Sequence, residues 1–283
     1  AMSSTARIVS INVNGIRAAY RKGFGEWLAA SGADIVTVQE VRAETSDVLA
    51  LVDGWHVLHD AALAKGRAGV AILSREPAIG GPRLDLATPD LAEATNTSGR
   101  WLEADFRLGN QTVTVVSTYV HSGEVDTPKQ AEKFLFLEAM HRRLAEIKAE
   151  SPLAVVTGDL NVGHRTLDIK NWKGNVKKSG FLPEERAWFD RYLGAEGDPD
   201  YNAGGGLGWV DVGRKFAGEV PGPYTWWSQR GQAFDTDTGW RIDYHLATPD
   251  LAARVVDYRV DRAASYGERW SDHAPVIADY TVD

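Results

Sequence analysis

Short apolar runs recur along the chain, and several of them end abruptly on polar side chains. Leu153–Val156 is one such run, and it is followed by Gly158, Asp159 and Asn161. Short apolar runs bounded by glycine and polar residues are typical of buried β-strands. Asp159 and Asn161 lie two positions apart, so an extended backbone would point both side chains the same way. Together they could orient a water molecule beside an anionic oxygen, although an Asx turn that only caps the backbone is an alternative.

The same pattern predicts further strands along the chain. They are Arg7–Val13, Asp34–Glu40, Ala68–Ser74, Arg100–Phe106, Gln111–Val120, Tyr224–Trp227, Trp240–Leu246 and Val276–Val282. The strands on either side of Leu108–Asn110 predict an antiparallel hairpin. Strands outnumber helices, which favours a mixed two-sheet core with helices outside.

Helices are predicted where apolar residues recur at steps of three or four. Ile16–Ala30 predicts a helix that Gly23 and Gly25 weaken. Thr127 followed by Pro128 has the layout of a helix start, and a long amphipathic helix should follow. Another helix should begin at Pro183. Pro77–Pro89 and Asn202–Gly208 are rich in glycine or proline and are predicted to be connections.

Composition narrows the class of protein. The 283 residues are 25% charged and 43% hydrophobic, which are ordinary values for a globular chain. We expect a single α/β domain over residues 5–283, with Ala1–Ser4 a remnant of expression. The chain has no cysteine, which excludes disulfides and thiolate chemistry. No stretch of about 18 apolar residues and no signal pattern is present, so we expect a cytoplasmic protein without membrane contact. The net charge of −8 argues mildly against a general nucleic-acid coat protein but does not exclude a nuclease.

A series of short motifs then occurs in a fixed order. The motifs are Ile11–Arg17, Val38–Glu40, Tyr119, Gly158–Asn161, Trp240–Asp243 and Ser271–His273. In this order they resemble the exonuclease III class of AP endonucleases over nearly the whole chain. Gly174–Arg186 is similar to the DNA-contacting insertion and following helix of that class. The resemblance implies a four-layer α/β sandwich related to deoxyribonuclease I, with two mixed β-sheets packed face to face and helices outside.

The resemblance also implies an activity. It predicts a DNA repair nuclease that uses Mg²⁺, or alternatively Mn²⁺, and acts as a monomer on double-stranded DNA. The expected targets are abasic sites and blocked 3′ ends, through AP endonuclease, 3′-to-5′ exonuclease and 3′-phosphatase activities. The residue types fit this chemistry, since water attacking a phosphodiester needs a base, a cation near the phosphoryl oxygens and stabilisation of the leaving oxygen.

Roles for individual residues follow from the same resemblance. The expected catalytic residues are Tyr119, Asp159, Asn161, Asp243 and His273. The expected metal ligands are Glu40, as the main ligand, with Asn12, Asp159, Asn161 and Asp272. Asp159 would orient or deprotonate the water, which Asn161 would hold with the phosphate. His273, oriented by Asp243, would donate a hydrogen bond to a phosphate oxygen, with Tyr119 in support.

DNA contacts are implied by a further set of positions. They are Arg17, Lys22, Asn175, Lys177, Lys178, Trp226, Trp240 and Ile242. The last three match a small apolar pocket that accepts a base-free sugar, which is also the cheapest residue to extrude from a duplex. The basic residues would contact phosphates and read no bases.

Each assignment has a structural competitor. Trp226 and Trp240 could belong to the core, and the lysine-rich segment (Lys170–Lys178) could be a solvated surface. Glu40 could form a buried salt bridge to an arginine. At the level of the whole protein, the alternatives are another phosphoesterase on the same fold, such as a nonspecific deoxyribonuclease or deadenylase, or a DNA-binding module without catalysis. The chain also departs from the family pattern at His121–Ser122, where a proline and an amide residue are common.

Overall fold

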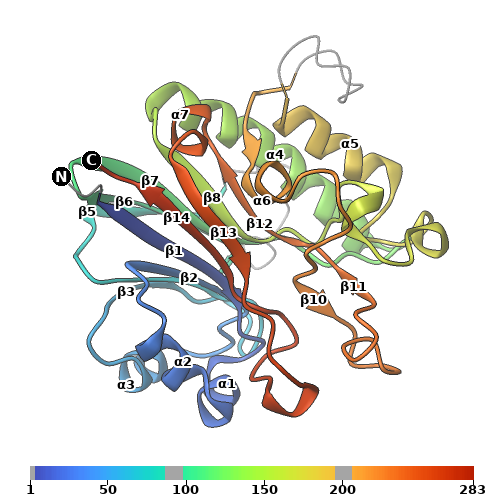
Figure 1. Cartoon of the computed structure of the whole chain (residues 1–283), viewed down its shortest axis with the longest axis horizontal. Helices are drawn as coiled ribbons and strands as arrows, with labels where there is room; N and C mark the ends of the chain where they lie inside the picture. Colours follow the sequence, from blue (N-terminus) through green and yellow to red (C-terminus); the bar gives the residue numbers. More distant parts are fainter. Residues whose placement is uncertain (1–3, 87–97, 195–205) are drawn as a thin grey trace.

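Residues 4–86, 98–194 and 206–283 are described by the structure, which is a computed structural model. Its strands form two six-stranded sheets and a two-stranded ribbon (Figure 1). The first sheet has the order β13 (Val255–Val260), β14 (Val276–Thr281), β1 (Thr5–Asn12), β2 (Ile35–Gln39), β4 (Val70–Ser74) and β3 (His56–Asp60). The second has the order β5 (Ile79–Leu84), β6 (Trp101–Leu108), β7 (Gln111–Tyr119), β8 (Ala154–Asp159), β12 (Asp243–Ala247) and β9 (Val210–Asp211). The ribbon pairs β10 (Trp226–Trp227) with β11 (Gly239–Trp240).

Both sheets are mixed. The pairs β1–β2 and β7–β8 are parallel, and the other neighbouring strands are antiparallel. In a parallel pair the two carboxyl ends lie at the same edge. Each sheet therefore presents two strand ends side by side at one edge, which is where the polar motifs lie.

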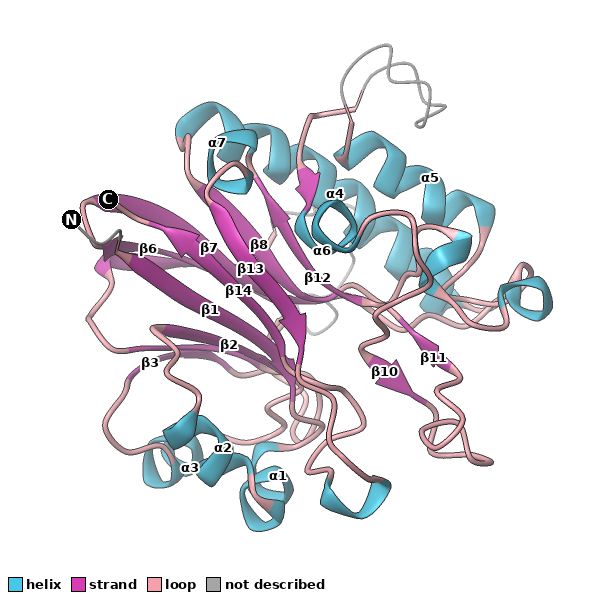
Figure 2. Cartoon of the chain, viewed as in Figure 1, coloured by secondary structure: helices cyan, strands magenta, loops and turns pink. Residues whose placement is uncertain are grey.

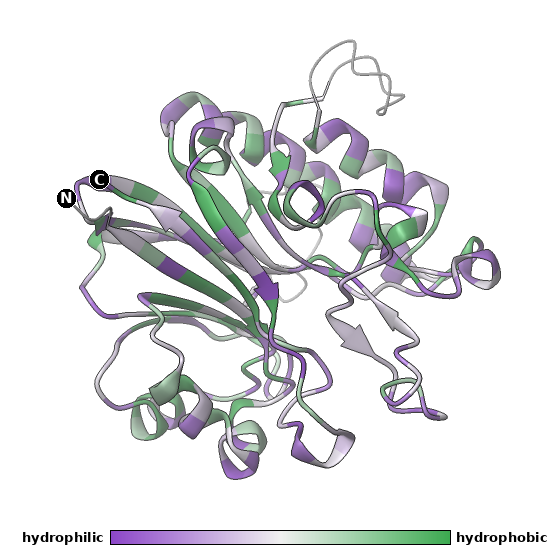
Figure 3. Ribbon diagram, in the orientation of Figure 1, coloured by the Kyte–Doolittle hydropathy of each residue, from purple (hydrophilic) through white to green (hydrophobic). Residues whose placement is uncertain are grey.

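Four layers stack around three apolar clusters. Between the sheets, residues such as Ile8 and Ile72 of the first pack against Phe106 and Val155 of the second. Helices α1 (Ile16–Lys22), α2 (Phe24–Ala30) and α3 (Thr45–Leu51) cover the outer face of the first sheet, and α4 (Pro128–Glu150) and α5 (Pro183–Tyr192) cover that of the second (Figure 2). The short helices α6 (Val212–Ala217) and α7 (Pro249–Ala252) pack beside β12. Figure 3 shows hydrophobic residues concentrated in the central strands. The predicted four-layer sandwich is confirmed.

The predicted long helix is confirmed as α4. Proline occupies its first turn after Thr127, and Leu137, Met140, Leu144 and Ile147 are buried against β7 and β8. Thr127 is the N-cap residue, as predicted, but its hydroxyl accepts no hydrogen bond from the first turn and donates to the Glu124 carbonyl. Among the described helices, not even this one is long and apolar enough to cross a membrane.

Three segments differ from their predicted structure or lie partly outside the described residues. Ile16–Ala30 is two helices, because Gly23 at φ 127° breaks the hydrogen-bond ladder between them. Pro77–Pro89 contains the strand β5, which tolerates glycine and proline because it is an exposed sheet edge. Residues 202–205 of the predicted loop Asn202–Gly208 lie outside the described residues, as do residues 87–89. The strands β3, β9 and β13 were not predicted.

Gly158 tests the close approach of β7 and β8. It has φ 143°, and a Cβ atom there would lie 1.9 Å from the Thr118 carbonyl oxygen. We expect Gly158→Ala to lower the free energy of unfolding by about 3 kcal/mol or more. Gly267→Ala, where a Cβ would meet nothing within 4 Å, is the control and should change it by less than about 0.5 kcal/mol. Denaturant unfolding measures both, and equal effects would contradict the strand packing.

Candidate active site

The sheet topology gathers the predicted site residues at one edge of both sheets. In the second sheet Tyr119 ends β7 and pairs in register with Asp159, which ends β8. Asp159 in turn pairs with Asp243, the first residue of the antiparallel strand β12. In the first sheet Asn12 ends β1, and Glu40 directly follows β2. The strand ends that the sequence singled out therefore meet in space.

His273 reaches the same edge from the loop before β14. Because β14 runs antiparallel to β1, its start lies beside the end of β1. The Ser271 hydroxyl donates to the Asn12 carbonyl at 2.6 Å, and His273 forms a bridge with Trp226 of the ribbon. The last motif of the chain is thereby joined to the first.

A chain of hydrogen bonds links the central groups. His273 Nδ1 donates to Asp243 Oδ2 at 2.8 Å, and the same oxygen accepts from Thr225 Oγ1 at 2.7 Å. His273 Nε2 lies 3.6 Å from Asp159 Oδ2, which also accepts from Asn12 Nδ2 at 2.9 Å. Asp243 thus fixes the ring orientation and leaves Nε2 facing Asp159.

Burial and neighbouring charges shift both titrating groups. Burial, together with the Asp243 carboxylate, raises the pKa of Asp159 to about 8. Burial alone would lower the pKa of His273, but the carboxylates of Asp243 and Asp159 outweigh it and raise the pKa to about 10. At neutral pH, His273 is therefore a cation that can donate, and Asp159 is a carboxyl with unusual proton affinity.

Asn161 lies in a turn, which corrects the extended geometry expected for it. Its φ is 50°, and its amide N–H donates to Asp159 Oδ1 at 3.0 Å, as in an Asx turn. Its side-chain Nδ2 donates to the Val120 carbonyl at 2.8 Å. The alternative of a backbone-capping turn is therefore correct for the main chain, and the turn keeps Asn161 beside Asp159.

Glu40 also has a left-handed backbone, with φ 48°. Residues held in this region cost about 1–3 kcal/mol and are found preferentially at functional sites. Its carboxylate lies 2.9 Å from Arg42, so the alternative of a salt bridge to an arginine is present, with a Glu40 side chain that is 12% exposed and an Arg42 side chain that is 45% exposed. Tyr119 hydrogen-bonds Glu40, and burial followed by the charge of Glu40 raises the pKa of the Tyr119 hydroxyl well above 10. Tyr119 thus supports Glu40, whereas the sequence led us to expect that it would support His273.

The donor set at this edge fits a hard cation. Asp159, Asp243 and His273 offer ligand atoms within 4.8 Å of one another. Oδ1 of Asp243 and Oδ1 of Asp272 are buried and have no hydrogen-bond partner among the described residues. Buried carboxylate oxygens without partners are costly, and Mg²⁺ prefers such oxygens. Asn12 is already engaged, because its Oδ1 accepts from the Asn14 amide while its Nδ2 holds Asp159.

Two tryptophans flank this group. Trp226 and Trp240 are register partners in the ribbon, with ring centroids 6.0 Å apart and planes at 83°. Both are half-buried, whereas Ile242 and the neighbouring Trp227 are buried. Trp226 Nε1 donates to Asp272 Oδ2 at 3.3 Å. The pair therefore retains open ring surface next to the carboxylates, unlike core tryptophans.

The lysine-rich segment starts and ends against Trp240. Ile169 directly precedes the segment and forms an isolated β-bridge with Trp240. Gly180 follows the segment, and its backbone packs on the Trp240 indole ring. Lys177 and Lys178 are exposed, and Asn175 donates to the Asn171 carbonyl at 2.7 Å. The segment thus projects beside the tryptophan pair.

The two basic residues of α1 differ in their surroundings. Arg17 is exposed and lies 3.9 Å from Asp47 of α3. Lys22 lines a groove of about 530 Å³ between α1 and residues 266–272, which also includes Asn14 and Asp272. Lys22 therefore borders a groove that reaches Asp272, and Arg17 is not among the residues that line it.

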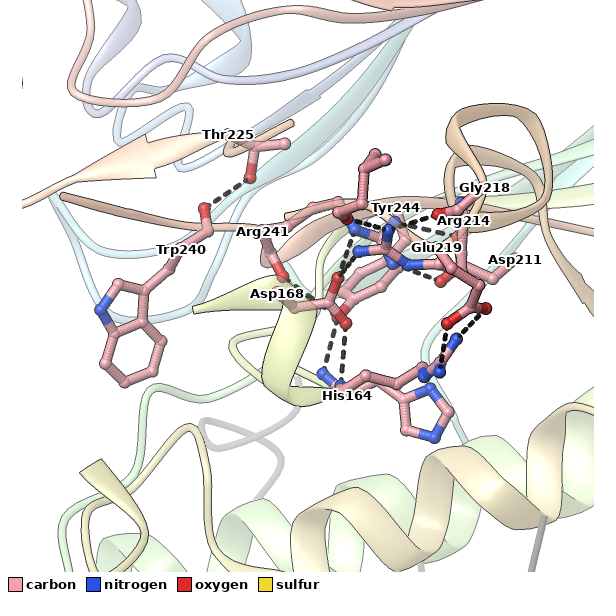
Figure 4. Close-up of polar contacts among 12 residues, drawn as sticks. His164, Asp168, Asp211, Arg214, Gly218, Glu219, Thr225, Trp240, Arg241 and Tyr244 are labelled. Atoms are coloured by element: carbon pink, nitrogen blue, oxygen red, sulfur yellow. Dashed lines mark hydrogen bonds and ion pairs between the residues drawn. The ribbon is translucent and has the colours of Figure 1, made fainter. Parts of the chain in front are cut away.

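A buried charge network under Trp240 was missed from the sequence (Figure 4). Arg241 donates to Asp168 at 2.8 Å and also binds Asp211, while Arg214 binds Asp168 as well. Burial alone would raise the pKa of Asp168, but the charges of Arg241 and Arg214 outweigh it and lower the pKa to about 2. Arg241 lies between Trp240 and Ile242 in the sequence motif, so the residue itself could have been singled out. Its carboxylate partners could not be predicted from the sequence. The network fixes Arg241 and with it the connection between β11 and β12, in which Ile242 also lies.

Comparison with known proteins identifies the class. The chain belongs to the Endonuclease/Exonuclease/phosphatase family, which it matches over residues 9–273. This family is metal-dependent, and the buried group of Asp159, Asp243 and His273 could hold an ion. The family that the motif order predicted is thereby confirmed.

Individual relatives lie among the DNA repair nucleases. An exodeoxyribonuclease of Bacillus subtilis (strain 168) is 30% identical over 271 residues, which are 95% of this chain and 97% of the relative. The structure of an AP endonuclease from Archaeoglobus fulgidus matches with a TM-score of 0.77 and 29% identity, over 97% of this chain and 99% of that one. The 3′ phosphatase NExo from Neisseria, bound to a product DNA hairpin, matches with a TM-score of 0.79 and 27% identity over the same shares.

The charge on His273 can be measured in the metal-free protein. Its folded pKa of about 10 lies above the unfolded value of about 6.5, so its stabilising contribution is complete below about pH 6.5 and is lost as the pH rises through 10. NMR titration of the imidazoles should show His273 charged at pH 8. Asp243→Asn should lower its pKa.

His245 provides an internal control for this titration. Burial lowers its pKa to about 4, and its ring accepts from Tyr280 and donates to the Val276 carbonyl, as expected of a packing residue. It should stay neutral above pH 5. A His273 pKa near 6.5, unchanged in Asp243→Asn, would contradict the described electrostatics.

Proposed function

We propose that this nuclease hydrolyses phosphodiester bonds of double-stranded DNA at abasic sites and at 3′ ends, with Mg²⁺ as its cofactor. The proposal covers AP endonuclease, 3′-to-5′ exonuclease and 3′-phosphatase activities, carried out by a cytoplasmic monomer. Support comes from relatives named as exodeoxyribonuclease, AP endonuclease and 3′ phosphatase, each matched over nearly its whole length.

One observation carries the proposal. The Asp159 carboxyl, whose pKa is raised, lies 3.6 Å from the imidazolium of His273. The half-buried rings of Trp226 and Trp240 lie next to this pair. Hydrolysis of a phosphodiester needs a proton acceptor for water and a cationic donor for the phosphoryl group, in reach of one reacting phosphorus. These two groups meet both needs.

In the proposed reaction, the ionised carboxylate form of Asp159 orients the water and accepts its proton as the water oxygen bonds to phosphorus. The bond from phosphorus to the 3′-oxygen breaks, and that oxygen takes a proton from solvent. His273, held by Asp243, donates its Nε2–H to a phosphoryl oxygen as negative charge builds there. Asn161 keeps the water beside Asp159.

Glu40 and Asp272 would hold the metal, with Asp159 and Asn161 beside it and Tyr119 supporting Glu40. When bound, Mg²⁺ neutralises charge on the phosphoryl and leaving oxygens. Oδ1 of Asp272 is free to accept this role, and Asn12 contributes by orienting Asp159.

Substrate selection would come from the ribbon and the basic margins. Trp226, Trp240 and Ile242 would wall a space for a flipped abasic sugar that a full nucleotide does not fit. Lys177, Lys178 and Asn175 would contact phosphates on one side, and Arg17 and Lys22 on the other. A deoxyribonuclease without damage preference is the second candidate, and it would need neither the tryptophan pair nor the lysine-rich segment.

The reaction is tested with three duplexes, carrying an abasic analogue, an undamaged end or a 3′-phosphate. We expect cleavage with Mg²⁺ and none with EDTA. Asp159→Asn keeps the shape but loses the proton acceptor, so we expect kcat to fall at least about 100-fold. Glu40→Ala should lower turnover most at limiting Mg²⁺ and recover partly with excess metal. Full activity in EDTA would refute the metal dependence, and normal turnover of Asp159→Asn would assign the water to another group.

Damage selection is tested by opening the tryptophan pair. Trp240→Ala and Trp226→Ala should lower the ratio of abasic to undamaged cleavage, measured per folded molecule. Because loss of a tryptophan also costs about 3–5 kcal/mol in a core, the folded fraction is measured first. Trp188→Ala on α5, which removes a partly buried tryptophan elsewhere, is the control and should keep the ratio. A ratio unchanged in both ribbon variants would leave the tryptophans a purely structural role.

A further inference from the structure

A lysine and a glutamate are fully buried between α4 and α5. The side chains of Lys133 and Glu185 form an ion pair, and both have no solvent exposure. A buried ion pair rarely adds stability over an apolar pair of the same size, because desolvation offsets the attraction. The role of the pair is therefore better judged from the backbone groups that Lys133 and Glu185 bind than from the attraction between the two charges.

Lys133 binds two loops of the site. Its Nζ donates to the Asn161 carbonyl at 2.7 Å and to the Ser122 carbonyl at 3.2 Å. The first bond fixes the left-handed residue beside Asp159, and the second fixes the loop that follows Tyr119. One ammonium thus ties the turn after β8 to the turn after β7.

Glu185 binds the residues that directly follow the lysine-rich segment. Its Oε1 accepts from the amides of Gly180 and Leu182, at 2.8 and 2.9 Å. Gly180 packs on Trp240 so closely that a Cβ there would lie 2.7 Å from the indole ring. The other end of the ion pair therefore reaches the proposed wall of the sugar site.

The packing around the pair leaves little freedom. Gly123 has φ 74°, and a Cβ there would lie 2.6 Å from Gln130 Oε1 and 3.0 Å from Lys133 Cδ. Ser179 Oγ donates to the Ser122 carbonyl at 2.7 Å and so closes the ring of contacts. The loops are fitted around the lysine stem as well as bonded to its head.

We propose that Lys133 is a positioning residue, which sets Asn161 and the loop at Ser122 in the arrangement that incision requires, while Glu185 docks the lysine-rich segment to the same point. The inference rests on the proposed function, because it concerns the geometry of that reaction. A misplacement of about 1 Å at a reacting group can lower the rate about 100-fold, so a residue that only holds Asn161 can govern turnover.

The test removes the Lys133 ammonium and keeps the hydrogen bonds from residue 185 to the backbone of Gly180 and Leu182. In Lys133→Met with Glu185→Gln, the amide oxygen of the glutamine still accepts from Gly180 and Leu182. Gln130 Nε2 donates to Glu185 Oε2 at 3.2 Å, and a flip of the Gln130 amide lets its unpartnered Oε1 accept from the new amide instead. We expect kcat for incision of an abasic-analogue duplex to fall at least about tenfold per folded molecule, with KM changed less than about twofold.

The matched control removes a second ion pair of the same helix. Arg143→Met with Glu103→Gln deletes a pair about 15 Å further along α4. It should lower the thermal midpoint and leave kcat and KM unchanged. If the Lys133 variant does not fold, Lys133→Gln with Glu185→Gln replaces it, since its shorter amide cannot span to the Asn161 carbonyl and kcat should fall likewise.

The outcomes separate this inference from the proposed function. An unchanged kcat, or a change in KM alone, would overturn the positioning role while the wild type still incises. A wild type that does not incise would overturn the proposed function. Hydrogen exchange then decides the inference: the amides of Asn161 and Gly163 should exchange faster in the Lys133 variant than in the Arg143 control, and equal exchange would overturn it.

Discussion

The two sheets are held in register at the site by buried polar pairs that cross between them. Along β1, β2, β7 and β8 the residues facing the other sheet change from apolar to polar toward the carboxyl end. In β1, for example, they are Ala6, Ile8, Ser10 and Asn12. The crossing pairs are Thr37 with Thr157, Gln39 with Ser117 and Asn12 with Asp159. Since each polar group would be costly if left unpaired, the sheets cannot slide without losing several bonds at once.

This constraint explains how the site can hold charges so close together. Asp159, Asp243 and His273 are buried, and Glu40 and Asn161 have unfavourable backbone conformations. Such groups persist only where their surroundings determine them fully. Apolar packing at one end of the sandwich holds the two sheets together. The polar pairs at the other end fix how the sheets are aligned at the site.

Much of this arrangement was visible in the sequence. Strand ends and their polar residues follow from periodicity, whereas the association of Asn12, Glu40 and Asp159, which lie on two different sheets, was predicted through the family resemblance. The position of Asp243 opposite Asp159 was not, because register between distant strands depends on pairing across 84 residues of chain. For Asn161 the sequence left an extended strand and an Asx turn as alternatives, because both compete over the same residues, and the structure has the turn.

Other contributors could not be found by residue type alone. Thr225 holds Asp243, and Lys133 holds Asn161, yet each occurs in a segment whose pattern indicated only a strand or a helix. A lysine on the inner face of an amphipathic helix was the one available signal, because Lys133 falls between the apolar residues of α4. Hydrogen-bond partners that are distant in sequence can be identified only once the fold is known.

The central claim is that water, placed by Asp159, attacks phosphorus at an abasic site. It is tested most directly by incising a duplex with a natural abasic site in H₂¹⁸O and weighing both fragments by mass spectrometry. The account predicts one ¹⁸O atom in the new 5′-phosphate and a 3′-hydroxyl on the other fragment. A 5′-phosphate without label, opposite a fragment that ends in an unsaturated aldehyde, would show strand cleavage by elimination and contradict it.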